Sequence, residues 1–343
     1  MTKRQSNHLI PYLQKQMKNK KILVTGGAGY IGLHCIVALI SSGYQPIVID
    51  NFCNSSKSVF QKLKQITKQK IKFYHFDLRN KKKLERIFKQ YSFHAVIHFA
   101  GLKSVAESSK DPLLYFNNNI TSSISLLECM KENKVFKLIF SSSACVYNAD
   151  EPLPWSETTK VGKTTNPYGT SKYIIERILI DLAKSDPKWQ IGIARYFNPI
   201  GNHSSGLIGD NPKGVPNNLV PYITKVIKGE LPYLNIFGND YKTKDGTGVR
   251  DYIHVMDLAD AHVNILKNFR NIKGCEIYNF GSGNGETVLG ITNCFESILQ
   301  KKIPFKYKKR RAGDVQASYT HNKKSFDRLK WKVKRNNFQA IKD

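Results

Sequence analysis

Residues 22–32 read ILVTGGAGYIG, an apolar run that leads into three regularly spaced glycines, Gly26, Gly29 and Gly32. Glycines at a turn from strand to helix let backbone N–H groups and the helix N-terminus approach a pyrophosphate closely. A glycine triplet alone also occurs in ordinary turns. Here, however, the next apolar run ends at Asp50, about 20 residues on, where the ribose-binding acid of a dinucleotide site is expected. The stretch therefore predicts a Rossmann-type fold.

The residues after Asp50 indicate which dinucleotide is bound. Asn51 and Phe52 follow it, and no arginine stands next to it to receive a 2′-phosphate. We therefore expect NAD rather than NADP. Asp77 is predicted to end the third strand, and Phe99 and Ala100 the fourth, at the edge of the sheet where a dinucleotide lies.

Short apolar runs alternate with segments of helical period over the first part of the chain. The runs KILVT, PIVID, IKFYHF, HAVIHFAG and FKLIFSSS are nearly continuous, as in strands that are covered on both faces. Helices are expected at 31–42, 81–91 and 117–132. This order predicts an α/β fold with a doubly wound parallel sheet.

A further helix is expected after Asn166 and Pro167, which favour a helix start, and the apolar run WQIGIARYF follows it. Beyond Asn198 glycine, proline and asparagine become frequent, and only 221–228 has a clear helical pattern up to residue 248. We therefore expect a basic, disordered extension (1–19), an NAD-binding domain (20–197) and a smaller mixed α/β substrate domain (198–343), with some elements exchanged between the last two.

The composition excludes some classes of protein and leaves others open. The 343 residues carry a formal net charge of +28, but lysines are spread along the chain and no nucleic-acid motif accompanies them, so we expect no nucleic-acid partner. No apolar run approaches the roughly 20 residues of a membrane span. The six cysteines lack CxxC spacing, which argues against a metal site and favours reduced, buried thiols in the cytoplasm. The acid-free segment 1–19 shares one property with transit peptides, but Pro11 interrupts any amphipathic helix there.

The segment YGTSK places Tyr168 and Lys172 one helical turn apart, on one face of the expected helix. A tyrosine with its ordinary pKa of about 10 is a poor base at neutral pH unless a nearby cation stabilises the phenolate. Lys172 can supply that charge, and Ser143, at the end of the fifth run, can hydrogen-bond the same reacting hydroxyl. Such a pair also arises by chance in a chain rich in lysine and tyrosine. The glycine turn and the serine favour the catalytic interpretation.

These residues belong to a wider resemblance. From about Lys20 to Trp331 the chain resembles the extended short-chain dehydrogenase/reductase superfamily and, within it, the UDP-glucose 4-epimerase family. The resemblance is carried by TGGAGYIG, DNFCNS, FAGLKSV, SSSACVY, NPYGTSK, RYFNPIG, VPNNLVPYI, IFGNDYKTKDGTGVRDYIHV and RRAGDV.

The resemblance implies an isomerase of galactose metabolism that interconverts UDP-glucose and UDP-galactose through a 4-keto intermediate, with NAD reduced and reoxidised in each turnover. It also implies a homodimer formed through two helices of the NAD domain. The implied catalytic residues are Ser143, Tyr168 and Lys172. The implied cofactor contacts are Gly26, Gly29, Tyr30, Ile31, Gly32, Asp50, Asn51, Ser55, Asp77, Leu78, Phe99, Ala100, Lys103, Asn118, Tyr168, Lys172 and Tyr196. The implied substrate contacts are Lys103, Ser143, Tyr168, Asn198, Asn218, Leu219, Asn235, Phe237, Arg250, Arg311, Asp314 and Ser318. Arg250 and Arg311 offer forked donors to a diphosphate, although surface solvation is the ordinary role of an arginine.

The chain departs from the family pattern at a few places. Cys145 and Asn148 replace a threonine and a glycine near the catalytic serine, and the last helix is expected to be shorter and less firmly docked. In the family, a tyrosine at the position of Ser318 goes with plain hexoses, whereas a small residue leaves room for an N-acetyl group. We therefore expect UDP-GlcNAc and UDP-GalNAc as further substrates, unless a slip of one residue places Tyr319 in the pocket.

Two other interpretations remain. A sugar-nucleotide 4,6-dehydratase or a pentose 4-epimerase shares the fold, but a dehydratase is expected to have acidic residues where Ala144 and Cys145 follow Ser143. A catalytically silent NAD-binding regulator would keep the glycine turn and lose the reactive side chains, all of which are present here.

Overall fold

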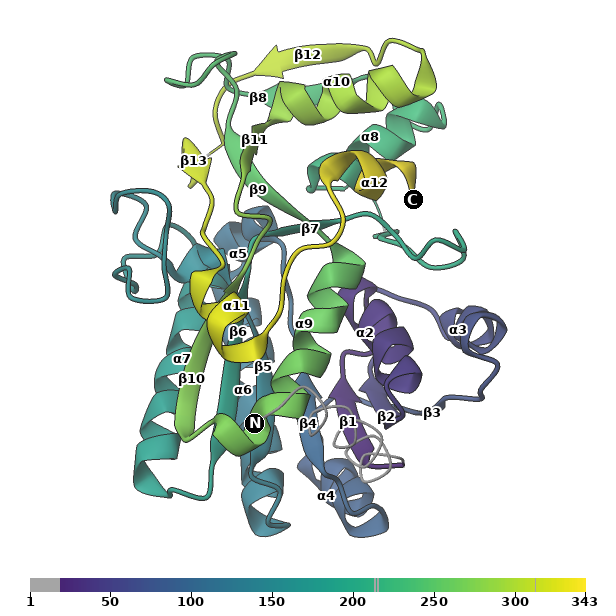
Figure 1. Ribbon diagram of the computed structural model, residues 1–343, viewed down its shortest axis with the longest axis vertical. Helices are drawn as coiled ribbons and strands as arrows, with labels where there is room; N and C mark the ends of the chain where they lie inside the picture. The colour runs from purple at the N-terminus through teal and green to yellow at the C-terminus, as the bar shows by residue number, and fades with distance from the viewer. Residues whose placement is uncertain (1–18, 213, 215, 312) are drawn as a thin grey trace, which may run out of the picture.

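The computed structural model describes residues 19–212, 214, 216–311 and 313–343 (Figure 1). The expectations for a disordered or targeting extension fall on residues 1–18, outside the described residues.

A seven-stranded parallel sheet forms the centre of the described chain, in the order β10-β6-β5-β4-β1-β2-β3. β1 lies between β2 and β4, so the strand order reverses there, and ligands of such sheets bind beside the carboxyl ends at this switch point. The predicted doubly wound fold is confirmed. The strands are β1 (Lys21–Thr25), β2 (Gln45–Asp50), β3 (Lys72–His75), β4 (Ala95–His98), β5 (Lys137–Ser143), β6 (Gln190–Tyr196) and β10 (Gly274–Phe280).

Helices cover both faces of this sheet, which explains why its strands are apolar throughout. In β1, Ile22 and Val24 belong to the core on one face, and Leu23 belongs to the core on the other. The first face is covered by α2 (Tyr30–Ser41), α3 (Val59–Thr67) and α9 (Val255–Asn268), and the second by α4 (Lys81–Gln90), α6 (Pro112–Glu132) and α7 (Pro167–Ser185).

The helix starts follow local capping chemistry. Asn166 caps α7 by accepting a hydrogen bond from Gly169 N at 2.8 Å, and Pro167 follows it, as predicted. α6 begins at Pro112 rather than near residue 117, because Asp111 caps it by accepting from Leu114 N. α3 and the six-residue α5 (Val105–Lys110) were not predicted.

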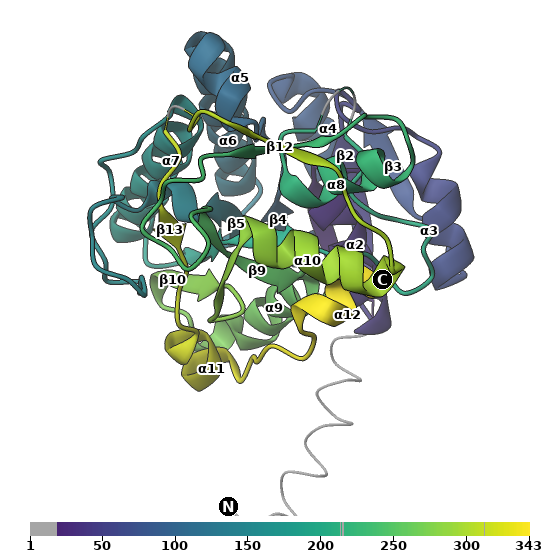
Figure 2. The same cartoon turned by 90° about the horizontal axis from the view of Figure 1, so that it is seen from above.

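A smaller unit lies at the carboxyl ends of the strands (Figure 1), and the view from above shows it in front of the sheet (Figure 2). It contains a sheet in which β9 pairs with β7, β11 and β13, and the separate pair β8–β12. Its elements are β7 (Asn198–Ile200), α8 (Leu219–Ile227), β8 (Leu234–Phe237), β9 (Val249–His254), β11 (Gly285–Thr287), α10 (Val288–Leu299), β12 (Phe305–Lys308), β13 (Ala317–Ser318) and α12 (Asn337–Lys342). The helix α11 (Lys323–Leu329) packs instead against β10 and α9 of the large fold. Because α9 and β10 follow residue 198 and yet complete the large fold, a boundary at 197/198 stays a proposal.

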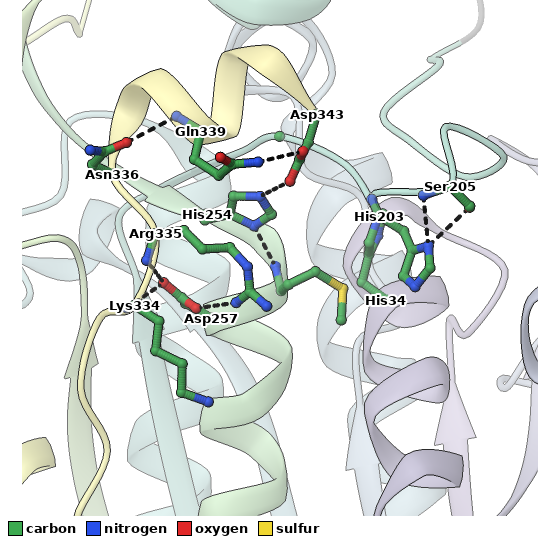
Figure 3. A network of polar contacts seen from close by, with 12 residues as sticks. His34, His203, Ser205, His254, Asp257, Lys334, Arg335, Asn336, Gln339 and Asp343 are labelled. Carbon is green, nitrogen blue, oxygen red and sulfur yellow. Dashed lines mark hydrogen bonds and ion pairs between the residues drawn. The ribbon is translucent and has the colours of Figure 1, made fainter.

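The C-terminal segment is anchored to α9 by a buried carboxylate (Figure 3). Asp257 is 1% exposed, and its Oδ2 accepts from Lys334 N at 2.8 Å and from Arg335 N at 2.9 Å. The Arg335 guanidinium contacts Oδ1 of the same carboxylate. At the end of α12, Asp343 contacts His254 Nε2 at 3.1 Å. These bonds attach α12 to the junction between the two units.

Two further expectations concern cysteines and membranes. Of the six cysteines, Cys53 is exposed and only Cys35 and Cys129 are fully buried, so the expectation of six buried thiols is wrong. Within the described part of the chain, no helix combines the length and the hydropathy needed to cross a bilayer.

The Asp257 anchor predicts unequal effects for two neighbouring substitutions. Arg335→Met removes the charged partner of a buried carboxylate, and we expect it to lower the free energy of unfolding by about 1–3 kcal/mol. Lys334→Met removes only an exposed pair with Asp260 at 2.8 Å, and about 0–1 kcal/mol is expected. Urea unfolding of both variants measures the difference. Equal losses would contradict the anchoring role of Arg335.

Candidate active site

The glycine turn after β1 is closely packed against the turn after β4. Gly26 has φ +69°, and a Cβ there would lie 2.5 Å from Ala100 N; a Cβ on Gly32 would lie 2.6 Å from Gly26 O. Gly29 is the N-cap residue of α2 and caps it without a side chain. Because glycines have no side chain, the backbone segments can pack this closely. The glycines also place no side chain over the N-terminus of α2, which leaves it open to a phosphate.

Asp50 ends β2 and supports the glycine turn. Its Oδ2 accepts from Ala28 N at 2.9 Å and its Oδ1 from Phe52 N at 2.8 Å. Burial raises the pKa of this carboxyl, whereas the two N–H donors act in the opposite direction. Each carboxylate oxygen keeps a free lone pair, so the predicted contact with a ribose hydroxyl fits the site.

Asp77 lies two residues beyond β3 and is held by a partner that was not predicted. Arg79 Nε donates to Asp77 Oδ1 at 2.9 Å, and Asn51 Nδ2 donates to Oδ2 at 3.2 Å. The Arg79 guanidinium holds the pKa of the Asp77 carboxyl at about 2. Nearby, Ser55 Oγ is buried and has no hydrogen-bond partner among the described residues. A ligand oxygen or nitrogen would satisfy it, so the residues present fit a dinucleotide.

The other predicted cofactor residues differ in how their side chains are used. Lys103 is exposed and lies 3.7 Å from Asp210, and Tyr196 is buried with its hydroxyl bonded to His262 of α9. Their contacts with a cofactor therefore stay predictions. The remaining predicted positions are Tyr30 and Ile31 at the start of α2, Leu78 after β3, Phe99 and Ala100 after β4, and Asn118 in α6.

Ser143 and Tyr168 are brought together from β5 and α7. Ser143 ends its strand, as predicted, and its Oγ accepts from Cys145 N at 3.2 Å. A hydrogen bond with the Ser143 side chain lowers the pKa of Tyr168, but burial of the phenol has the larger effect and raises that pKa well above its ordinary value. The chain alone therefore keeps Tyr168 protonated, and the expected phenolate, which also depends on the positive charge of oxidised NAD, stays a prediction.

Lys172 is 4% exposed and lies one turn further along α7. Its Nζ donates to Ser141 O at 2.7 Å and lies 4.9 Å from the centroid of the Phe140 ring. Burial lowers the pKa of Lys172 to about 8, and the charge of Glu176 acts in the opposite direction. The ammonium is thus fixed by the backbone of β5 at the level of the catalytic pair.

Two buried polar interactions that hold α7 in place were not predicted from the sequence. Glu176 forms a buried ion pair with Arg195 Nη2 at 2.6 Å, which ties α7 to β6. Asn119 Nδ2 donates to Ser171 Oγ at 3.0 Å, and its Oδ1 accepts from Leu102 N at 2.8 Å. The available signal was polar residues in apolar helices: Glu176 stands four residues after Lys172, and Asn119 lies on the buried face of α6.

The predicted substrate residues form a charged cluster in the smaller unit. Arg311 Nε donates to Asp314 Oδ2 at 2.8 Å, and Arg250 Nη2 lies 3.7 Å from Asp314 Oδ1. The Arg311 guanidinium also lies 4.8 Å from the centroid of the Phe237 ring. The carbonyl of Gly313, next to Asp314, accepts a hydrogen bond from Thr165 Oγ1 at 3.1 Å, so the cluster lies beside the start of α7, the helix that carries Tyr168.

The uncharged substrate positions lie on several elements of the smaller unit. Asn235 Nδ2 donates to Tyr222 Oη at 3.0 Å, while its Oδ1 is buried and unpartnered among the described residues. Ser318 is buried in β13 and pairs in register with Arg250 of β9. The other predicted positions are Asn198 at the start of β7, Asn218 at the N-cap of α8 without a side-chain cap bond, and Leu219 in its first turn.

The buried ammonium of Lys172 predicts a pH dependence of stability. The pKa of Lys172 is about 8 in the folded chain and about 10.4 in an unfolded chain. Between these pH values the lysine is mostly neutral in the folded chain and mostly protonated in the unfolded chain. Raising the pH through this window therefore favours the folded state. Relative to Lys172→Met, the wild-type free energy of unfolding should rise by about 3 kcal/mol between pH 8 and pH 10.5 and stay constant below pH 8.

Urea unfolding at a series of pH values measures this difference. Lys184→Met, which removes an exposed lysine of the same helix, is the matched control. A difference between wild type and Lys172→Met that does not change with pH would contradict the proposed cost of burying the ammonium.

Comparison with known proteins gives one consistent result. Residues 22–281 match the model of the NAD dependent epimerase/dehydratase family. The UDP-glucose 4-epimerase of Neisseria meningitidis serogroup C is 49% identical over 324 residues, which are 94% of this chain and 96% of that protein. The solved UDP-glucose 4-epimerase of Bifidobacterium longum, in complex with NAD+ and UDP, superposes with a TM-score of 0.92 at 45% identity, over 94% of this chain and 96% of that one.

A UDP-Glc/GlcNAc 4-epimerase from Campylobacter jejuni superposes with a TM-score of 0.81 at 31% identity, over 94% of this chain and 97% of that one. The glycine turn, the effect of Ser143 on the Tyr168 phenol and the buried Lys172 agree with these relationships. The chain belongs to the UDP-glucose 4-epimerase family, within the NAD dependent epimerases and dehydratases.

Proposed function

We propose that the protein interconverts UDP-glucose and UDP-galactose by inverting C4 of the sugar, with NAD as a resident cofactor. The observation that carries the proposal is that Ser143, at the end of β5, acts on the Tyr168 phenol beside the buried ammonium of Lys172, at the carboxyl edge of a sheet with an open glycine turn. The curated relatives of the same length share this activity by name.

NAD would be held by the glycine turn, Asp50 and Ser55. Asp50 is available to a ribose hydroxyl, and the unpartnered Ser55 Oγ is available to a polar atom of the nucleotide. When bound, NAD supplies reversible two-electron oxidation of the sugar at C4. Lys172, fixed to Ser141 O, would stand beside it as a second cation.

Tyr168 is the group that holds and moves the proton of the sugar 4-hydroxyl. Because burial raises its pKa in the chain alone, the phenol can become a base only when positive charge is added near it. Lys172 is already present when this pKa is raised, so the further positive charge has to come from the oxidised cofactor. Ser143 keeps the hydroxyl group within hydrogen-bonding reach of Tyr168 while the proton passes.

The diphosphate would bind to the cluster of Arg250 and Arg311. Both guanidiniums lie at Asp314, which holds them close together, so they can offer forked donors to the same diphosphate. An anchor on the nucleotide leaves the sugar free to present either face of C4 to the catalytic groups, which inversion requires.

Substitution of the catalytic pair tests this function directly. In the double variant Ser143→Ala, Tyr168→Phe, kcat with UDP-galactose should fall by a factor of about 10² to 10⁴, because a positioned acid–base group contributes a factor of that size. Product formation is measured by separating UDP-glucose from UDP-galactose without added cofactor. Unchanged activity of the double variant would reject the mechanism, and a wild-type protein that binds NAD without turnover would favour a silent regulator.

We further propose that UDP-GlcNAc and UDP-GalNAc are substrates. Support comes from Ser318, a small buried residue next to Arg250. Its neighbour Tyr319 packs on another surface, since a Cβ on Gly285 of β11 would lie 3.1 Å from the Tyr319 ring. Adjacent strand residues face opposite ways, so the pairing favours Ser318 rather than Tyr319 at the sugar.

Ser318→Tyr should remove this second activity selectively. The larger side chain fills the space of the N-acetyl group, so kcat/KM for UDP-GalNAc should fall on the order of 100-fold or more while UDP-galactose is still converted. Ser318→Ala, which stays small, is the control and should keep both activities. A wild-type protein that converts UDP-galactose but not UDP-GalNAc would show that the assignment is wrong.

A homodimer through helices of the NAD domain and a cytoplasmic location also stay proposals. The first is supported by exposed apolar side chains on α6, where Leu113 is 78% and Ile124 is 40% exposed. Association of this helix with a second copy would bury them.

A further inference from the structure

Tyr241 lies in the loop between β8 and β9, within the motif IFGNDYKTKDGTGVRDYIHV, and has no role in the mechanism above. Its backbone N–H donates to Gly246 O at 3.0 Å, and its ring lies against Gly238, where a Cβ would be 2.5 Å from ring atom Cε2. The guanidinium of Arg310 lies 4.0 Å from the ring centroid, and Arg310 Nε donates to Asp240 Oδ1 at 2.8 Å. The ring is therefore held on several sides.

The hydroxyl of this fixed ring has no partner within the protein. Tyr241 is only 6% exposed, and among residues 19–212, 214, 216–311 and 313–343 no group hydrogen-bonds its Oη. Leaving a buried polar group unpaired costs about 1–3 kcal/mol, and native proteins rarely keep such a group without a reason. Two of the other unpaired buried atoms belong to Ser55 and Asn235, both of which are expected to contact ligands.

The surroundings of Tyr241 indicate which ligand would satisfy the hydroxyl. Burial raises the pKa of this phenol, as does the charge of Asp314, so the group is a hydrogen-bond donor at neutral pH. Arg311 directly follows Arg310, which stacks on this ring, and its guanidinium lies 4.8 Å from the ring centroid of Phe237. Because Phe237 directly precedes Gly238, which contacts the Tyr241 ring, Tyr241 lies beside the arginine cluster expected to bind a diphosphate. A donor among cationic groups is suited to a phosphate oxygen.

We propose that the Tyr241 hydroxyl donates a hydrogen bond to the diphosphate of the bound nucleotide sugar and so acts as a third donor beside Arg250 and Arg311. This inference rests on the proposed function, because it takes a nucleoside diphosphate sugar as the ligand. Arg310 is a positioning residue here: its guanidinium stacks on the ring and fixes the direction of the hydroxyl.

Tyr241→Phe separates this role from a purely structural one, because the two roles predict opposite results. Removing an unpaired buried hydroxyl should leave the Tm of the ligand-free holoenzyme unchanged or raise it. If the hydroxyl binds a charged oxygen, the Kd for UDP should rise by about tenfold to a hundredfold. The KM for UDP-galactose should rise by a similar factor while kcat changes little.

Calorimetric titration of the holoenzyme with UDP and with uridine, which lacks phosphate, completes the test. Uridine affinity should be the same in wild type and Tyr241→Phe, and Tyr307→Phe, at an exposed tyrosine of β12, should change neither affinity. Unchanged UDP affinity in Tyr241→Phe, a lowered Tm without ligand, or an equal loss for uridine would each overturn the inference. A wild-type holoenzyme that does not bind UDP would instead contradict the proposed function.

Discussion

The close approach of two backbone turns, after β1 and after β4, is the constraint on which the rest of the site depends. Gly26 comes so near to Ala100 that no side chain fits between them, and the same turn is fastened to β2 through Asp50. Three neighbouring strands thus end at one place, the switch point of the sheet. Because α2 starts from this turn, its N-terminal N–H groups face the ligand, and a larger residue at Gly26 would separate the turn from both strands.

Much of the larger domain could be predicted because its signals are local. Continuous apolar runs identified the parallel strands, and Asn166 with Pro167 identified the start of α7. The helix α3 and the short α5 were missed, and β10 could not be assigned to the large sheet from its sequence. Its pairing with β6 links Gly274 to Gln190 across a long intervening segment, and no local pattern encodes that distance.

The catalytic pair of the candidate site could be predicted from the sequence, whereas the buried ion pair that holds its helix could not. Tyr168 and Lys172 are neighbours on one helix, so spacing alone placed them together, whereas the pairing of Glu176 with Arg195 depends on how α7 packs on the sheet. Spacing indicated a cation near Tyr168, but burial, which only the fold reveals, raises the pKa of the phenol. Proton transfer therefore needs charge from outside the chain, which couples catalysis to a bound cofactor.

The two units meet where the chain leaves β6 for β7, and the contacts there explain how a change in one unit reaches the other. Tyr30, in the first turn of α2, donates from its hydroxyl to Gly201 O, and His34 Nε2 accepts from His203 N at 3.0 Å. Burial lowers the pKa of His34 to about 4, so it is neutral at pH 7 and can accept that hydrogen bond. The segment after β7 therefore stays attached to the helix that follows the glycine turn.

From the other side, α12 covers the same segment, since a Cβ on Gly201 would lie 2.9 Å from Ala340 O. The carboxylate of Asp343, beside His254, and the Asp257 anchor hold α12 there (Figure 3). The C-terminal segment thus braces the loop that follows β7 of the substrate side and that contacts the cofactor side through Tyr30. A rigid loop between two ligand sites is useful to an enzyme that must hold a nucleotide sugar at a fixed distance from its cofactor while only the sugar turns.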